Sequence, residues 1–144
     1  MNILVSACLI GVNCRYSGKS EMHCDVLKLM ERHTLIPVCP EIYGGLATPR
    51  VPAEISGDKV ITKDGLDVTK EYMRGAEEVL RLARLYSCKY AVMKERSPSC
   101  GFGKIYDGTH SGTLTDGSGI CADLLNRNGI IVVGESMVNS LLDV

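Results

Sequence analysis

Cysteine is the residue type with the most chemical reactivity in this chain, and it occurs seven times in 144 residues. An odd number of cysteines cannot pair completely within one chain, and a reducing compartment disfavours structural disulfides. Thiolates bind soft metals and act as nucleophiles, whereas an inert cysteine behaves as a small buried hydrophobic residue. The surplus therefore indicates a metal or cluster site or reactive thiols, with inert packing as the remaining alternative.

Two of the cysteines stand next to residues that interrupt regular structure. Pro40 follows Cys39 directly, and Cys100 lies between Pro98 and Gly101, where glycine lets the backbone approach a bound group closely. Iron–sulfur clusters and zinc are the leading partners for such thiolates. Structural zinc sites usually take ligands in local pairs such as C-x-x-C, and the sequence has no such pair. The spacing therefore favours an iron–sulfur cluster over zinc.

Short apolar runs alternate with amphipathic segments, and together they predict the elements that must position these thiols. Strands are expected at residues 2–7, 35–38, 59–62, 90–93 and 130–133, and helices at 22–33, from 67 or 69 to about 87, at 121–128 and at 135–142. Strands that alternate with helices are typical of an α/β fold. We expect a single three-layer Rossmann-like domain over residues 1–144, with a mostly parallel sheet covered by helices on both faces.

Three of the cysteines follow the carboxyl ends of expected strands: Cys8 after the first, Cys39 after the second and Cys100 after the strand at 90–93. In an open parallel sheet these ends share one edge, and ligand sites form in the crevice beside it where the strand order reverses. Residues far apart in the sequence are therefore expected to meet at this edge.

The composition, with 45% hydrophobic and 23% charged residues, is that of a soluble globular protein. The 16 basic and 17 acidic residues leave a net charge of −1, so no broad basic surface attracts nucleic acid or an anionic membrane. The first residues lack the pattern of a signal peptide, and no apolar run approaches the roughly 18 residues of a membrane span. We expect a cytoplasmic protein. No feature indicates an oligomeric state.

Longer motifs connect these cysteines to a known family. They are residues 5–16, which include Cys8 and Cys14, 39–50, 94–101, 105–108 and 126–130. Together these segments resemble the thiouracil desulfidase family, a bacterial family first known only as a domain of unknown function. The resemblance extends over nearly the whole chain.

The resemblance implies a 4Fe-4S cluster held by Cys8, Cys39 and Cys100, with the fourth iron left open. It implies an enzyme that binds a thiolated nucleobase and removes its sulfur, for example converting 2-thiouracil to uracil. Glu41 and Ser97 stand close to the cluster cysteines in the sequence, and the resemblance implies that they are functional, Glu41 as an acid–base group and Ser97 as an orienting hydroxyl.

Two other functions are compatible with the same residues. One is a non-catalytic iron–sulfur or sulfur-carrier protein, and the other is a zinc or redox-thiol protein without a cluster. Four further residues lie within the motifs without an assigned role: Cys14, Arg15, Arg50 and Arg96.

Overall fold

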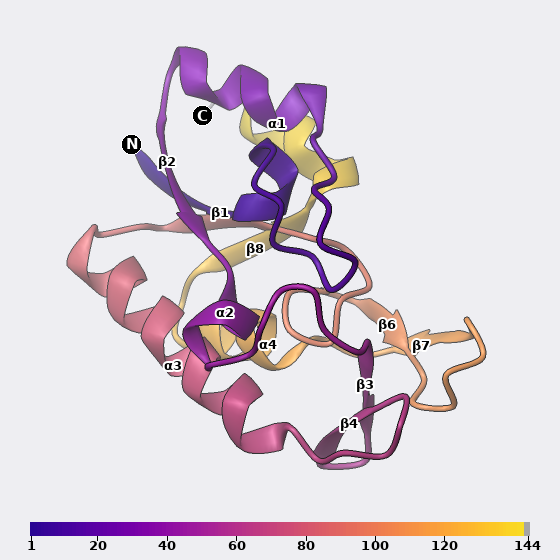
Figure 1. Cartoon of the computed structure of the whole chain (residues 1–144). Coiled ribbons are helices and arrows are strands. Elements are labelled where there is room, and N and C mark those ends of the chain that lie inside the picture. Colours follow the sequence, from indigo (N-terminus) through magenta and orange to yellow (C-terminus); the bar gives the residue numbers. More distant parts are fainter. Residues whose placement is uncertain (143–144) are drawn as a thin grey trace.

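Four parallel strands form the central sheet of the computed structural model, which describes residues 1–142 (Figure 1). They are β1 (Asn2–Ser6), β2 (Thr34–Val38), β5 (Tyr90–Met93) and β8 (Ile131–Gly134), in the spatial order β2-β1-β5-β8. Each neighbouring pair is parallel. The chain runs outward from β1 to β2 and then returns to β5 on the other side of β1, so the strand order reverses between β1 and β5.

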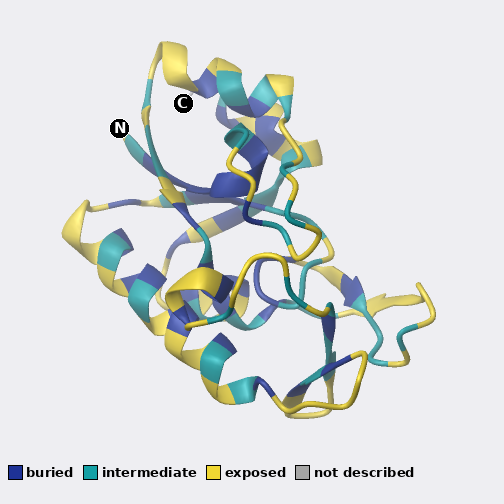
Figure 2. Ribbon diagram, viewed as in Figure 1, coloured by how far each residue is buried: buried dark blue, intermediate teal, exposed yellow. Residues whose placement is uncertain are grey.

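Helices cover both faces of this sheet. Side chains alternate between the faces of a strand, and Leu4 accordingly packs toward α3 (Thr69–Leu85) and α4 (Ile120–Arg127). Ile3 and Val5 pack on the opposite face against three short helices. These are α1 (Cys24–Lys28), η2 (Leu29–Glu31) and η3 (Glu135–Leu141). The strands between the two helical layers are the most deeply buried part of the chain (Figure 2).

The predicted α/β fold, with a parallel sheet between helices, is therefore confirmed. One of the predicted strands lies outside the central sheet. The predicted strand at 59–62 is β4 (Lys59–Thr62), but it pairs antiparallel with β3 (Ala53–Ser56) outside the central sheet. The two-residue turn at Gly57–Asp58, with Gly57 at a φ of 64°, makes these strands a local hairpin. The expectation of one domain over residues 1–144 stays a prediction.

Two other segments differ from the expected elements. The glycine-rich stretch at 101–119 contains a second hairpin of β6 (Lys104–Tyr106) and β7 (Leu114–Asp116). The helix expected at 22–33 is shorter, because α1 ends at Lys28 and continues only as the 3₁₀ turn η2. Within residues 1–142, no helix combines the length and the apolar character needed to cross a membrane.

Two glycines let α2 (Pro40–Tyr43) lie directly against α3. A Cβ added to Gly75 would stand 1.8 Å from the carbonyl oxygen of Pro40, and one added to Gly44 would stand 1.9 Å from the carbonyl oxygen of Glu71. The backbones of the two helices are therefore in contact with no side chain between them. Because α2 begins immediately after Cys39, this contact fixes the position of that cysteine and of the first turn of α2.

Replacing Gly75 with alanine tests this contact. In an exposed helix the change would stabilise by up to about 1 kcal/mol, but here the clash with Pro40 should destabilise by about 2 kcal/mol or more. The free energy of unfolding in urea measures the difference. The exposed neighbour Arg74, replaced by alanine, is the control and should change stability by less than about 0.5 kcal/mol. A Gly75→Ala protein as stable as the parent would contradict the close contact.

Candidate active site

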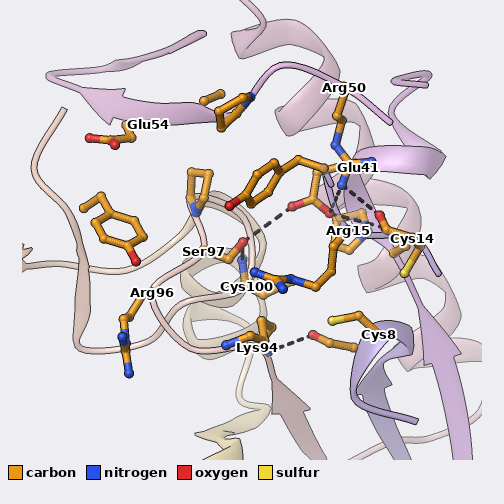
Figure 3. Close-up of a pocket in the computed structure, with 18 of the residues that line it drawn as sticks. Cys8, Cys14, Arg15, Glu41, Arg50, Glu54, Lys94, Arg96, Ser97 and Cys100 are labelled. Atoms are coloured by element: carbon orange, nitrogen blue, oxygen red, sulfur yellow. Dashed lines mark hydrogen bonds and ion pairs between the residues drawn. The ribbon is translucent and has the colours of Figure 1, made fainter. Parts of the chain in front are cut away.

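A cavity of about 570 Å³ opens at the carboxyl edge of the central sheet. Three segments that leave this edge form its floor: η1 (Ala7–Ile10) after β1, the start of α2 after β2, and residues 94–101 after β5. The five residues singled out from the sequence all line this cavity, namely Cys8, Cys39, Glu41, Ser97 and Cys100. Figure 3 shows Cys8, Cys100, Glu41 and Ser97 converging from different segments. The structure therefore brings together residues that are up to 92 positions apart in the sequence.

The three cysteines enter the cavity with free thiols. Cys8 and Cys100 are buried, whereas Cys39 is partly exposed. The neighbouring Cys14 thiol, burial and the Glu41 carboxylate raise the pKa of Cys39 far above its ordinary value. Burial, followed by the charge of Glu41, raises the pKa of Cys100 in the same direction. Both groups therefore stay protonated at neutral pH unless a positive centre replaces the proton.

Glu41 and Ser97 form a polar pair beside these thiols. The Ser97 hydroxyl accepts hydrogen bonds from the backbone N–H groups of Ser99 and Cys100, each at 3.1 Å. With its lone pairs engaged in this way, the hydroxyl points its proton toward Glu41 Oε1, 3.5 Å away. The other carboxylate oxygen, Oε2, accepts a hydrogen bond from the Cys39 thiol at 3.4 Å. Glu41 is therefore a buried carboxylate, 7% exposed, that joins the serine to a cysteine.

Arg50 supplies the positive charge next to this buried carboxylate. Its Nη2 lies 3.9 Å from Glu41 Oε2 and donates a hydrogen bond to the carbonyl oxygen of Cys14 at 3.0 Å. Its Nη1 donates to the carbonyl oxygen of Ala47 and the hydroxyl of Thr48. A buried carboxylate requires such compensation. The guanidinium thus holds two loops around the carboxylate, a positioning contact that the sequence motif left unassigned.

Two further residues of the cavity were not found by sequence reasoning. Lys94 follows β5 directly, and its Nζ lies 2.7 Å from Glu135 Oε2 and 3.6 Å from Glu21 Oε2. Its position at the end of a central strand is the same signal that selected the cysteines. Tyr72 reaches the cavity from α3, and burial, together with the Glu41 charge, raises the pKa of its phenol. No sequence signal distinguishes Tyr72 from the other apolar-face residues of its helix.

The two hairpins form the outer wall of the cavity. Glu54 of β3 accepts hydrogen bonds from the backbone N–H groups of Gly108 and His110 at 3.0 and 3.1 Å. The His110 ring lies 3.6 Å from the same carboxylate. These contacts connect the hairpins to each other. Arg15 and Arg96 also line the cavity, and Arg15 pairs with Glu21 at 3.2 Å.

Comparison with known proteins identifies the family of the chain. The sequence profile of the 2-thiouracil desulfurase family matches residues 3–137. The chain belongs to this family. A relative from Bacillus subtilis (strain 168), named uncharacterized protein YbbK, is 42% identical over 150 residues, which cover 97% of this chain and 99% of the relative. The resemblance expected from the sequence motifs is thereby confirmed.

A solved structure is also similar to this chain. It is described as a [4Fe-4S]-dependent thiouracil desulfidase, TudS, and is 44% identical with a TM-score of 0.90. The match covers 97% of this chain and 94% of the TudS chain. The chain is thus an enzyme of a carbon–sulfur bond-cleaving family. The roles of Cys8, Cys39, Cys100, Glu41 and Ser97 stay predictions.

Two neighbouring serines allow a matched test of the Ser97 turn. Replacing Ser97 with alanine leaves two backbone N–H groups without their acceptor and should lower the free energy of unfolding by about 1–3 kcal/mol. Ser99 is fully buried, and its hydroxyl has no hydrogen-bond partner among residues 1–142. Replacing Ser99 with alanine should therefore be neutral or stabilising. Denaturant unfolding of both variants measures the contrast, and equal losses would contradict the assigned hydrogen bonds.

Proposed function

We propose that this chain is a desulfidase that replaces the sulfur of a thiolated pyrimidine, such as 2-thiouracil, with oxygen from water. The products are uracil and hydrogen sulfide. The observation that carries the proposal is that three free thiols and the Glu41–Ser97 pair line one cavity. The family of the chain and the description of TudS support the same chemistry. We place the reaction in the cytoplasm, because a reducing compartment keeps such thiols free.

We propose that Cys8, Cys39 and Cys100 hold a 4Fe-4S cluster in this cavity. Thiolates are the usual protein ligands of such clusters. Within residues 1–142, no three His, Cys, Asp or Glu side chains converge closely enough to hold a single metal ion. The three thiols come from three segments that line the cavity, and a cluster with several iron atoms can take one ligand from each. This donor set fits an iron–sulfur cluster.

Bound by three cysteines, the cluster would supply a Lewis-acid iron without a protein ligand, to which a soft thiocarbonyl sulfur can bind. Arg50 and Lys94 place positive charge around the cavity. These basic groups are paired with the carboxylates of Glu41 and Glu135, so the iron ions of the cluster would be what balances the charge of the thiolates.

Glu41 and Ser97 would handle the protons of the reaction. Water must lose a proton as its oxygen attacks the ring carbon, and the leaving sulfur must gain protons. Glu41 Oε1 is the available base, and the Ser97 hydroxyl beside it can pass a proton between water and the carboxylate. One water supplies the oxygen and both protons of the hydrogen sulfide, so the overall exchange involves no net transfer of electrons.

Replacing Glu41 with glutamine distinguishes this enzyme from a non-catalytic cluster or sulfur carrier. The amide keeps the shape of the side chain but cannot accept a proton, so kcat for 2-thiouracil should fall by about 10²–10⁴-fold. Iron and sulfide content after anaerobic reconstitution should be unchanged. The surface residue Glu78 on α3, replaced by glutamine, is the control and should retain full activity.

Two outcomes would contradict the proposal. A Glu41→Gln protein that keeps its cluster and its full turnover would favour the carrier. Iron-free parent protein that still releases sulfide from 2-thiouracil would exclude the cluster from the reaction. Free 2-thiouracil, thiouridine and their phosphates, tested as substrates of the reconstituted protein, determine the substrate class.

A further inference from the structure

Cys14 is a fourth thiol in the cavity, and the proposed reaction does not use it. It is 3% exposed and lines the same cavity as the three proposed cluster ligands. Its backbone is held on both sides, because its N–H donates to the carbonyl oxygen of Val12 at 2.9 Å and its own carbonyl accepts from Arg50. The thiol is therefore presented to the cavity by a fixed piece of backbone.

The nearest chemical neighbours of Cys14 are other thiols. Its side chain interacts with those of Cys39 and Cys8, and the Cys39 sulfur also lies 3.8 Å from the carbonyl oxygen of Cys14. Figure 3 shows Cys14 and Cys8 directed toward the same space beside Arg15. Cys39 is the partly exposed thiol of the group, whereas Cys8, Cys14 and Cys100 are buried. An oxidant that enters the cavity therefore meets Cys39 first, with Cys14 next to it.

We infer that Cys14 and Cys39 form a reversible disulfide when no cluster occupies the cavity. The inference rests on the proposed function, because Cys39 is one of the proposed cluster ligands. One thiol of the pair loses its proton and its sulfur attacks a small-molecule disulfide, and the second sulfur, deprotonated in turn, then displaces the small thiol. Because their surroundings raise the pKa of both thiols, only a small fraction is thiolate at neutral pH, so this exchange is slow. The two cysteines lose two protons and two electrons, and the small-molecule disulfide is reduced to two thiols.

The pairing has two consequences for the cluster site. A sulfur in a disulfide cannot ligate iron, so oxidation of the pair and cluster loading exclude each other. A disulfide is also reduced by cellular thiols, whereas sulfinic and sulfonic acids are essentially irreversible. Cys14 thus provides a reversible oxidation site that spares a ligand cysteine from permanent damage. Because of Cys14, the disulfide would also have to be reduced before a cluster could be inserted.

Peptide mapping of the full-length, iron-free protein tests the inference. The protein is reduced, freed of iron by a chelator and equilibrated without oxygen in oxidised glutathione. The parent should lose the thiols of Cys14 and Cys39, in addition to the exposed thiol of Cys24, which can form a mixed disulfide with glutathione. Trypsin should then release residues 1–15 linked to residues 33–50, a species that dithiothreitol separates. Cys8 and Cys14 share the first of these peptides, so variants are needed to assign the bond.

Three serine variants identify the partner. The linked peptide should persist in Cys8→Ser and in Cys24→Ser, whose cysteine is exposed outside the cavity, and should be absent from Cys14→Ser. Cys14→Ala, checked by circular dichroism and thermal unfolding, repeats the result should the serine variant fold poorly. Oxidised parent protein should bind iron only after reduction, whereas oxidised Cys14→Ser should not carry this intramolecular block.

Several results would overturn the inference. These are a linked peptide that survives in Cys14→Ser, one that disappears in Cys8→Ser, or full retention of the Cys14 and Cys39 thiols in the oxidised parent. Failure of the proposed function is a separate observation. Reduced parent protein that binds no iron and releases no sulfide would refute the cluster enzyme. The linked peptide would still show whether Cys14 and Cys39 form a disulfide.

Discussion

The parallel pairing of β1 with β2 and β5 is the constraint on which the whole site depends. Ser6 pairs with Val38, and Val5 pairs with Val92, so the chain leaves these three strands at nearly the same level. Each exit then turns at once, into η1, α2 or the loop that carries Ser97. A register shift in either pairing would move one thiol away from the other two. The chemistry is thus set by backbone hydrogen bonds between strands.

Close backbone contacts fix the positions of the segments that leave the sheet. Gly75 and Gly44 allow α2 to rest on α3. A Cβ at Gly119 would meet the carbonyl oxygen of Ser99 at 2.5 Å, so the loop before Cys100 also packs closely on the start of α4. Arg50 then links the loops around Glu41. Backbone hydrogen bonds and ion pairs thus hold the polar side chains of the cavity in place. These contacts keep the Glu41 carboxylate buried beside a positive charge.

The sequence predicted the features that depend on local pattern. Apolar runs located all four strands of the central sheet, and the cysteines after three of them indicated a shared edge. The strand β4 was predicted, but its partner β3 and the hairpin of β6 and β7 were not recognised, because Pro52 and many glycines conceal short exposed strands such as β7. The contacts of Arg50 and Cys14 were equally out of reach. They join residues 36 and 25 positions apart, and only the folded chain brings such pairs together.

The position of β5 in the sheet determines when the site can be completed during folding. β5 lies between β1 and β8, and Cys100 follows it after more than two-thirds of the chain has been synthesised. Cys8 and Cys39 leave the ribosome before Cys100, and non-local strand pairing of this kind is slow. A complete set of three thiols therefore exists only after β5 has been inserted. A group that needs all three of the proposed ligands could therefore bind only after this stage, and it would then stabilise the folded chain by mass action.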